Sequence, residues 1–136
     1  MTVVKKDNEK AVETLRFPFV EGNTLIEVET LIYIETDRHR NLFHTTDHTY
    51  SIYRKLDEIE QQLDGLGFIR IHRSFLVNMR YIRRISSYIC YLKTGEQISV
   101  PKPRYPYVKK QFESFMLNDG NSTDISESEN AEEMEA

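Results

Sequence analysis

Short segments in which apolar and polar residues alternate run along most of this chain of 136 residues. They are rich in β-branched and aromatic side chains, and polar or glycine-containing stretches such as 21–23 separate them. An apolar residue at every second position places one face of a strand against a core, so each segment is predicted to be a strand. Before residue 55 the predicted strands are 15–19, 25–28, 31–34, 42–44 and 50–53.

Residues 55–63 break this alternation. Leu56, Ile59 and Leu63 recur there at helical spacing among Asp, Glu and Gln, which predicts one short amphipathic helix that a following Asp-Gly pair ends. Residues 107–116 are predicted to form a second helical segment, because apolar side chains again share one helical face. Between the two helices the strand pattern returns at 68–71, 75–77, 82–85, 88–92 and 97–100.

The pattern therefore predicts a mostly all-β fold with one short amphipathic helix and a C-terminal helical segment. Neither helix has a helical neighbour in the sequence, which argues against a helix-turn-helix protein. A chain of this length suits a single domain, and we expect that domain at residues 14–117. Residues 1–13 and 118–136 are polar and show no apolar period, so both ends are predicted to be disordered.

The charge of the chain, −4 overall, is unevenly distributed. Residues 1–67 carry 8 basic and 13 acidic side chains, residues 68–110 carry 10 and 1, and residues 111–136 carry 0 and 8. A basic block between two acidic segments is typical of a protein that faces phosphate groups with one surface. An uneven scatter of surface charges is the alternative, and the presence of only one acid in the block, Glu96, argues against it.

Other classes of protein are disfavoured. No apolar run reaches the ~18 residues of a membrane span and no secretion signal follows the first lysines, so we expect a cytoplasmic protein. We expect no metal and no cofactor, because the histidines lack the spacing of a metal site. An enzyme is not expected, because no nucleophile elbow or glycine-rich phosphate loop occurs. The only cysteine, Cys90, lies in a predicted strand and is expected to be a buried apolar side chain.

Residues 68–78, with the sequence FIRIHRSFLVN, resemble the signature of the LytTR DNA-binding domain. The segments that accompany this signature occur in the order of the family: 31–35, 56–63, Ile82, 95–100 and the pair Lys109 and Lys110. The resemblance covers about a hundred residues in all. It implies an elongated stack of β-sheets with a small helix, in which loops and not a recognition helix enter successive major grooves of DNA.

The chain departs from the family pattern after Val100, where the family commonly has a serine and then a basic residue. Here three prolines stand among Lys102 and Arg104 in residues 101–106. They are expected to stiffen a third DNA-contacting loop. Many members of the family also carry a phosphate-receiver domain, which this sequence does not contain. We therefore expect either a free-standing regulator or an excised domain.

Base reading requires forked or paired hydrogen-bonding groups, whereas a phosphate contact requires only a cation or a donor. The resemblance implies base contacts from three loops, at His39 or Arg40, at Arg73, and at Lys102 and Arg104. Without the resemblance, the polar turn 36–41 would be interpreted as a solvated hairpin. In the same way, Arg73 would be interpreted as the partner in a surface salt bridge.

Further residues near these loops are candidates for phosphate contacts: Arg38, Ser74, Arg80, Arg83, Arg84, Lys109 and Lys110. Ser74 has an alternative role as the cap of its turn, and the arginines have an alternative role in solubility. In a regular strand, alternation would place Arg83 and Arg84 on opposite faces, so that both cannot face one duplex. Asn78 is predicted to be structural, with a side chain that closes the backbone before Ile82.

These features predict a bacterial, sequence-specific transcription regulator whose partner is double-stranded DNA. The resemblance further implies DNA sites that are paired direct repeats, a second copy bound beside the first, and, in some members, a membrane-embedded inhibitor protein. The alternative is a protein-interaction module of the same fold that docks on another regulator. A related alternative is an autoinhibited regulator, in which the acidic C-terminal segment covers the basic block.

Overall fold

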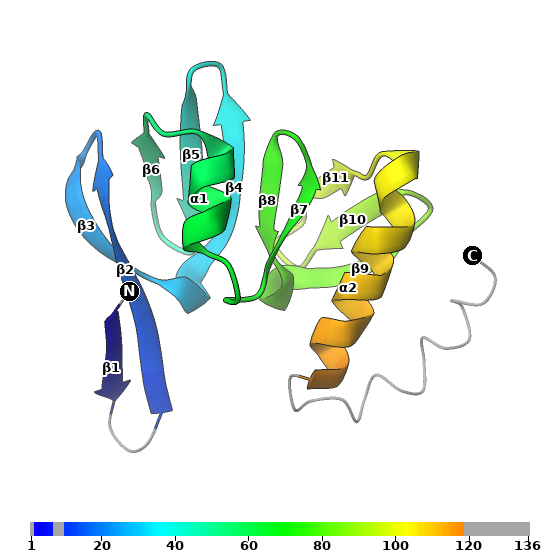
Figure 1. The fold of residues 1–136 in the computed structure, drawn as a ribbon, viewed down its shortest axis with the longest axis horizontal. Coiled ribbons are helices and arrows are strands. Elements are labelled where there is room, and N and C mark those ends of the chain that lie inside the picture. Colours follow the sequence, from blue (N-terminus) through cyan, green and yellow to red (C-terminus); the bar gives the residue numbers. More distant parts are fainter. Residues whose placement is uncertain (1, 7–9, 119–136) are drawn as a thin grey trace. The chain divides into compact units, whose positions relative to one another are not determined.

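The computed structural model describes residues 2–6 and 10–118, with side chains from residue 12 onward. The chain forms two compact units, Met1–Arg80 and Tyr81–Ala136, and Figure 1 shows the elements of each. The C-terminal segment that the sequence predicts to be disordered lies, from residue 119 onward, outside the described residues.

The first unit contains two antiparallel sheets, one of three strands and one of five. Their strands are β1 Thr2–Lys6, β2 Lys10–Phe19, β3 Gly22–Glu27, β4 Leu31–Asp37, β5 Arg40–Thr45, β6 Thr49–Ile52, β7 Phe68–His72 and β8 Phe75–Asn78. The order in the smaller sheet is β1-β2-β3, and the order in the larger sheet is β6-β5-β4-β8-β7. Helix α1, Leu56–Gln62, connects β6 to β7.

Strand β1 pairs with the start of β2, whereas the sequence predicts no regular structure for residues 1–13. Val4 stands opposite Val12 in this register, and Val12 is buried. An edge strand needs backbone hydrogen bonds from only one neighbour, so a stretch too polar and short to show an apolar period can still pair. The domain boundary expected at residue 14 consequently falls within strand β2.

Apolar side chains from both sheets and from α1 fill one core in the first unit. Phe17 and Phe19 of β2 meet Phe43 of β5 edge to face, with ring centroids 4.8 and 4.9 Å apart. Leu56 and Ile59 of α1 belong to the same core, and all five side chains are at most 5% exposed. The alternation in β2 and β5 and the helical period of α1 thus each turn their apolar side chains toward this core, as predicted.

Glu21 joins the turn between β2 and β3 to the edge strand β6. Its Oε1 accepts a hydrogen bond from the backbone N–H of Ser51 at 2.9 Å, and its Oε2 accepts one from the Ser51 hydroxyl at 3.1 Å. The backbone N–H of Val20 donates to the carbonyl of Ser51 at 2.8 Å. The hydrogen bond from the Ser51 N–H lowers the pKa of the Glu21 carboxyl below its usual value, although burial acts in the opposite direction.

This lowered pKa predicts an acid-dependent loss of stability. Because the folded-state pKa of Glu21 lies below its unfolded-state pKa, the ionised carboxylate stabilises the fold above the unfolded-state pKa. That contribution is lost as the pH falls through the folded-state pKa. We expect the free energy of unfolding of the wild type to decrease more steeply over this acidic range than that of Glu21→Gln, in urea titrations at a series of pH values. An identical pH dependence of the two proteins would contradict the assignment.

The second unit is an antiparallel sheet followed by a helix. Its elements are β9 Ile82–Ser86, β10 Ile89–Leu92, β11 Gln97–Ser99 and α2 Tyr105–Asn118, and the strand order is β11-β10-β9. Cys90 in β10 is fully buried, and burial raises the pKa of its thiol to about 12. The thiol is therefore neutral and packs as an apolar side chain, as predicted. Helix α2 confirms the second predicted helix and extends past both of its predicted ends.

The predicted fold class, mostly all-β with a short helix and a C-terminal helical segment, is confirmed. Nothing in residues 2–6 and 10–118 is a helix that is both long and apolar enough to cross a membrane. In the same part of the chain, no three His, Cys, Asp or Glu side chains gather in a way that could hold a metal ion.

Candidate nucleic-acid interface

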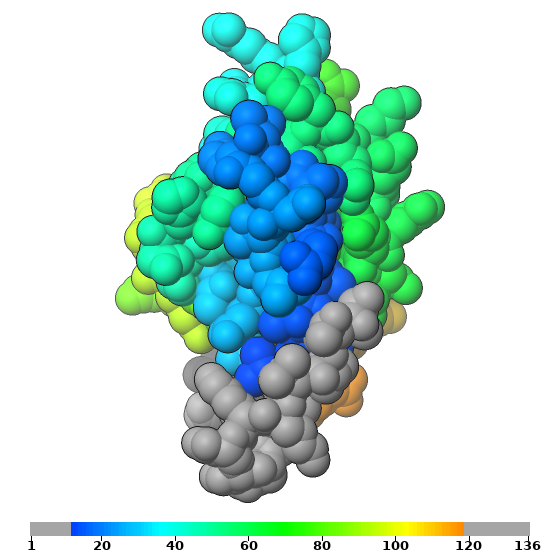
Figure 2. Space-filling model, turned by 90° about the vertical axis from the view of Figure 1, so that its left-hand side faces the viewer, coloured from blue at the N-terminus to red at the C-terminus, as the bar shows by residue number. Residues whose placement is uncertain are grey.

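The hairpin between β4 and β5 ends in a two-residue loop, Arg38 and His39, and both residues are exposed. Arg38 has a φ of 64°, in the left-handed region that glycine adopts freely and that costs other residues roughly 1–2 kcal/mol. The chain therefore keeps a cation where glycine would be less strained. Figure 2 shows this tip, in cyan, projecting beyond the β2–β3 hairpin, in blue. Beside the loop, Arg40 forms a largely exposed ion pair with Asp37 at 3.7 Å, which contributes little stability.

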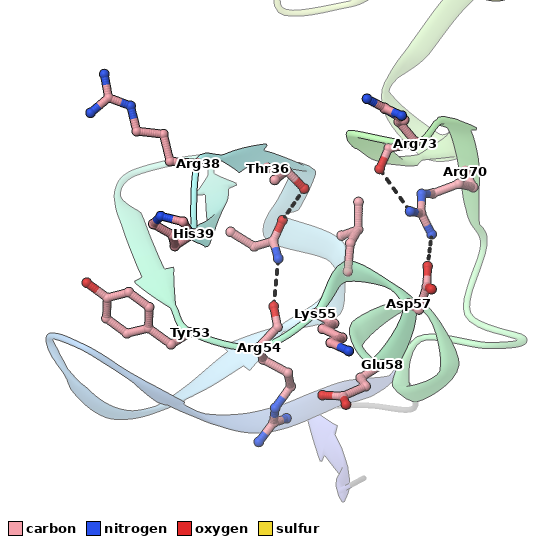
Figure 3. A pocket seen from close by; sticks show the side chains of 12 residues that line it. Thr36, Arg38, His39, Tyr53, Arg54, Lys55, Asp57, Glu58, Arg70 and Arg73 are labelled. Atoms are coloured by element: carbon pink, nitrogen blue, oxygen red, sulfur yellow. Dashed lines mark hydrogen bonds and ion pairs between the residues drawn. The ribbon is translucent and has the colours of Figure 1, made fainter.

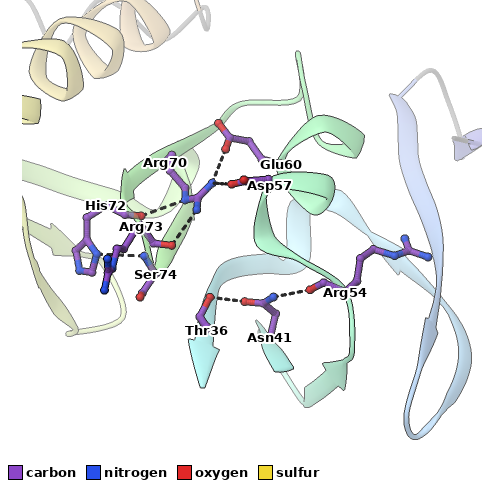
Figure 4. A network of polar contacts seen from close by, with 9 residues as sticks. All are labelled: Thr36, Asn41, Arg54, Asp57, Glu60, Arg70, His72, Arg73 and Ser74. Carbon is purple, nitrogen blue, oxygen red and sulfur yellow. Dashed lines mark hydrogen bonds and ion pairs between the residues drawn. The ribbon is translucent and has the colours of Figure 1, made fainter. Parts of the chain in front are cut away.

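The base of this hairpin is held by Asn41, which is 4% exposed. The hydroxyl of Thr36 donates to its Oδ1 at 2.7 Å, and its Nδ2 donates to the carbonyl of Arg54 at 2.7 Å (Figure 4). Arg54 lies in the connection between β6 and α1. One buried amide with both ends bonded therefore holds the hairpin against this connection, and the sequence pattern gave no sign of it.

The turn between β7 and β8, which carries Arg73, is held by Arg70. The Arg70 guanidinium donates to the carboxylates of Asp57 and Glu60 in α1 at 2.9 and 2.7 Å. It also donates to the backbone carbonyls of His72 at 3.1 Å and of Arg73 at 2.8 Å (Figure 4). Because a guanidinium presents its donors in a rigid fork, these four acceptors fix the turn to the helix. Arg70 is therefore a positioning residue for Arg73.

His72 completes the same turn. The backbone N–H of Ser74 donates to Nδ1 of His72 at 3.2 Å, which requires that this nitrogen carry no proton. Burial lowers the pKa of the His72 imidazole, and the charges of Arg73 and Arg70 lower it further, so the neutral ring is favoured at neutral pH. Arg73 is exposed and Ser74 is half-buried, and within residues 12–118 neither the Arg73 side chain nor the Ser74 hydroxyl makes a hydrogen bond.

The anchoring by Arg70 predicts a local effect on dynamics. Arg70→Met keeps an apolar stem and removes the guanidinium. The link between the carboxylates of α1 and the two backbone carbonyls of the turn is then lost. We expect amide hydrogen exchange at residues 72–74 to accelerate by at least about tenfold, with exchange in β5 and β6 unchanged. The measurement is hydrogen exchange followed by NMR. Unchanged protection of the turn would contradict the positioning role.

Both loops border one hollow of ≈ 550 Å³ in the first unit. Figure 3 shows Arg38 and His39 on one side of it and Arg73 on the other, with Lys55 between them. The structure thus brings Arg73 to the same hollow as Arg38 and His39, from which it is far apart in the sequence. Lys55 and Tyr53, from the connection between β6 and α1, also line the hollow. The sequence reasoning missed both residues, because only the Asn41 bridge places their segment beside the two loops.

A third group of predicted contacts lies in the second unit, where the β9–β10 turn meets the segment before α2. Ser87 and Tyr88 in this turn have φ values of 52° and 62°, both in the left-handed region. The ring of Tyr88 lies 4.5 Å from that of Tyr105, and the Lys102 Nζ lies 5.7 Å from the Tyr88 ring centre. The expected third loop is a single 3-10 turn, Lys102–Arg104.

Two further cations, in α2 and in the turn before it, lie against aromatic rings. The Arg104 guanidinium lies 4.9 Å from the ring centre of Tyr107, and the Lys109 Nζ lies 5.8 Å from that of Tyr105. Lys110 is exposed. The electron-rich face of an aromatic ring attracts a cation, so each ring helps to hold the cation beside it.

Arg83 and Arg84 are both exposed, and β9 is not the regular strand that the prediction from alternation assumes. The register between β9 and β10 shifts: Arg84 stands opposite Tyr91, and Ile82 stands opposite Leu92. The extra residue in β9 forms a bulge, which breaks the alternation of side chains between the two faces. The objection that both arginines cannot face one duplex applied to a regular strand, and that condition is not met here.

Arg80, a predicted phosphate contact, has internal partners. Its guanidinium donates to the carbonyl of Leu66 at 2.9 Å and to Oδ1 of Asn78 at 3.0 Å. Asn78 is fully buried, and its Nδ2 donates to the carbonyls of Leu31 at 2.8 Å and Val28 at 3.3 Å. The structural role predicted for Asn78 is confirmed, and Arg80 extends the same network.

Residues 21–113 of the chain match the family model described as the LytTr DNA-binding domain. The match covers more than half of the chain and includes both loops that border the hollow. The chain belongs to the LytTr DNA-binding domain family. The signature that it shares with the LytTr family, residues 68–78, spans β7, the Arg73 turn and β8.

Two regulators named LytT and LytR are similar to the chain in sequence. The chain is 34% identical over 122 residues to the sensory transduction protein LytT of Bacillus subtilis, covering 78% of this chain and 50% of that protein. It is 31% identical over 67 residues to the transcriptional regulatory protein LytR of Staphylococcus aureus, covering 49% of this chain and 27% of that protein. The chain thus spans half of the length of LytT and 27% of the length of LytR.

A solved structure also resembles the chain. A LytTr DNA-binding domain from Bacillus cereus superposes with a TM-score of 0.61 at 26% sequence identity, covering 75% of this chain and 96% of that one. The fold of the LytTr family is therefore shared beyond the residues of the signature.

Proposed function

We propose that this protein binds double-stranded DNA in a sequence-specific manner and regulates transcription. One observation supports this proposal most strongly: two loop tips, each carrying an exposed Arg, are held by side-chain hydrogen bonds beside one hollow in a member of the LytTr family. Preorganised loops lose little conformational entropy when they dock, so they can contribute to affinity and to specificity.

In this proposal, loops read bases in successive major grooves. Arg73 is the principal reader, because a guanidinium matches the O6 and N7 acceptors of guanine. His39 and Arg40 read from the β4–β5 hairpin, and Lys102 and Arg104 read from the second unit. Phosphate contacts come from the residues that need no base-edge geometry: Arg38, Ser74, Arg83, Arg84, Lys109 and Lys110. Arg80 is the weakest candidate, because Leu66 and Asn78 already accept hydrogen bonds from its guanidinium.

The proposal extends to the arrangement on DNA. Paired direct repeats would seat two copies side by side, and a membrane-embedded inhibitor would be a partner of the whole regulator. Resemblance to the family supports these two partners. The charge distribution supports an autoinhibitory role for the acidic C-terminal segment, whose residues 119–136 lie outside the described part of the chain.

The proposed function is tested by selecting duplexes from a randomised pool through binding to the full chain. We expect one sequence pattern to be enriched, and the selected duplex to shift in an electrophoretic mobility assay while a scrambled duplex requires more protein. Retention of all duplexes alike would reject sequence-specific binding. Failure to retain any duplex would favour the alternative of a protein-interaction module.

A further inference from the structure

Three cations around the hollow have no partner in the described part of the chain. They are Arg38 from the β4–β5 loop, Lys55 from the connection before α1, and Arg73 from the β7–β8 turn. All three are exposed, and no hydrogen bond or ion pair within residues 12–118 engages their side chains. The other two arginines of the hollow differ, because Arg54 donates to Gln62 and Arg70 is bound by acids and carbonyls.

The acids of the hollow leave this positive charge largely uncompensated. Asp57 is bound by Arg70, so its charge is already paired. Glu58 is the one other carboxylate among the residues that line the hollow. Three unpaired cations against one unpaired carboxylate give a concave surface that attracts anions.

Hydrogen bonds hold the backbone of the segment from which Lys55 and Tyr53 line the hollow. The carbonyl of Lys55 accepts hydrogen bonds from the backbone N–H groups of Glu58 at 3.0 Å and Ile59 at 3.1 Å, in the first turn of α1. The neighbouring carbonyl of Arg54 is bound by Asn41. Directly before these two anchored residues, Tyr53 is 70% exposed.

We propose that this hollow seats one sugar-phosphate strand of DNA, with Lys55 and the Tyr53 hydroxyl contacting phosphates on the path between the two base-reading loops. The inference rests on the proposed function. If the two tips enter grooves, a strand of the duplex passes the gap between them, and the groups along that gap meet its phosphates. Phosphate oxygens accept hydrogen bonds from cations and from hydroxyl groups alike, so exposed side chains of these two kinds suit a phosphate contact.

A matched pair of variants tests the lysine. Lys55→Gln and Arg16→Gln each remove one positive charge from an exposed side chain of the first unit, and Arg16 lies on β2 outside the hollow. Affinities for the selected and scrambled duplexes are measured over a range of salt concentrations. We expect Lys55→Gln to weaken both duplexes alike, by roughly 3- to 10-fold near 0.1 M salt, and to reduce the slope of log affinity on log salt by about 0.9. Arg16→Gln is expected to leave the slope unchanged.

Tyr53→Phe provides an independent test, because it removes a neutral hydroxyl. We expect it to weaken both duplexes by about 2- to 5-fold without changing the salt slope, since no counterion is released at a neutral donor. Circular dichroism melting confirms that each variant is folded.

The outcomes separate this inference from the proposed function. If the wild type binds DNA specifically but Lys55→Gln matches Arg16→Gln in affinity and slope, the inference is overturned and the proposed function stands. If Lys55→Gln weakens only the selected duplex, the lysine reads a base and the inference is likewise overturned. If the wild type binds neither duplex, the proposed function fails and this inference fails with it.

Discussion

Phe43→Ala is expected to lower the free energy of unfolding by about 3–5 kcal/mol, the largest effect of any substitution considered for this chain. Phe43 is fully buried, and its ring meets the rings of Phe17 and Phe19 at centroid distances of 4.8 and 4.9 Å. Truncation removes contacts with both sheets of the first unit and leaves a cavity that the surrounding rings fill only in part. Urea unfolding followed by circular dichroism measures the change.

Leu25→Ala is the control for this prediction. Leu25 lies on β3 in the same unit and is 48% exposed, so we expect its truncation to cost under about 1 kcal/mol. Equal costs for the two truncations would show that Phe43 does not join the sheets as the structure indicates.

The second large effect is expected for Asn78→Leu, which keeps the volume of the side chain and removes all of its polar atoms. Asn78 donates to the carbonyl of Leu31 and accepts from the backbone N–H of Arg80 at 3.0 Å and from the Arg80 guanidinium. Each buried group left without a partner costs on the order of 1–3 kcal/mol. We therefore expect a loss of several kcal/mol, measured by thermal and urea unfolding.

Asn23→Leu provides the comparison, since Asn23 is exposed on β3. We expect it to change the free energy of unfolding by at most about 0.5 kcal/mol. A cost of under about 1 kcal/mol for Asn78→Leu would mean that water or a backbone shift replaces the lost hydrogen bonds.

Alternating and helical apolar periods predict most of the fold, because each period depends only on which side chains face a core. The helix around Leu56 and Ile59 and the strands that flank the Arg73 turn follow directly from their periods. Strand β1 and the bulge beside Arg83 do not. Edge pairing depends on backbone hydrogen bonds that any sequence can make, and a bulge depends on register, which the pattern of one strand does not contain.

The sequence likewise predicts one part of the candidate site, the charged loop tips, but not the residues that support them. The charged tips at Arg38 and Arg73 are visible in the sequence, because they are cations in turns between predicted strands. Their supports are not visible. Arg70 stands among apolar residues of a strand, and its role arises only from the placement of α1 beside β7, which supplies Asp57 and Glu60 as partners. Long-range pairs of this kind are created by the fold and leave no local periodicity.

The central claim, that Arg73 reads a base, is tested most directly by a salt titration of Arg73→Ala on the selected and scrambled duplexes, with Lys110→Ala for comparison. The substitution leaves the Arg73 carbonyl in place for Arg70, so the turn keeps its anchor. We expect Arg73→Ala to lose about 1–3 kcal/mol of preference for the selected duplex, with nearly unchanged affinity for the scrambled one. Lys110→Ala should weaken both duplexes alike and flatten the salt slope by about one unit. Equal weakening of both duplexes by Arg73→Ala would contradict the claim and identify Arg73 as a phosphate contact.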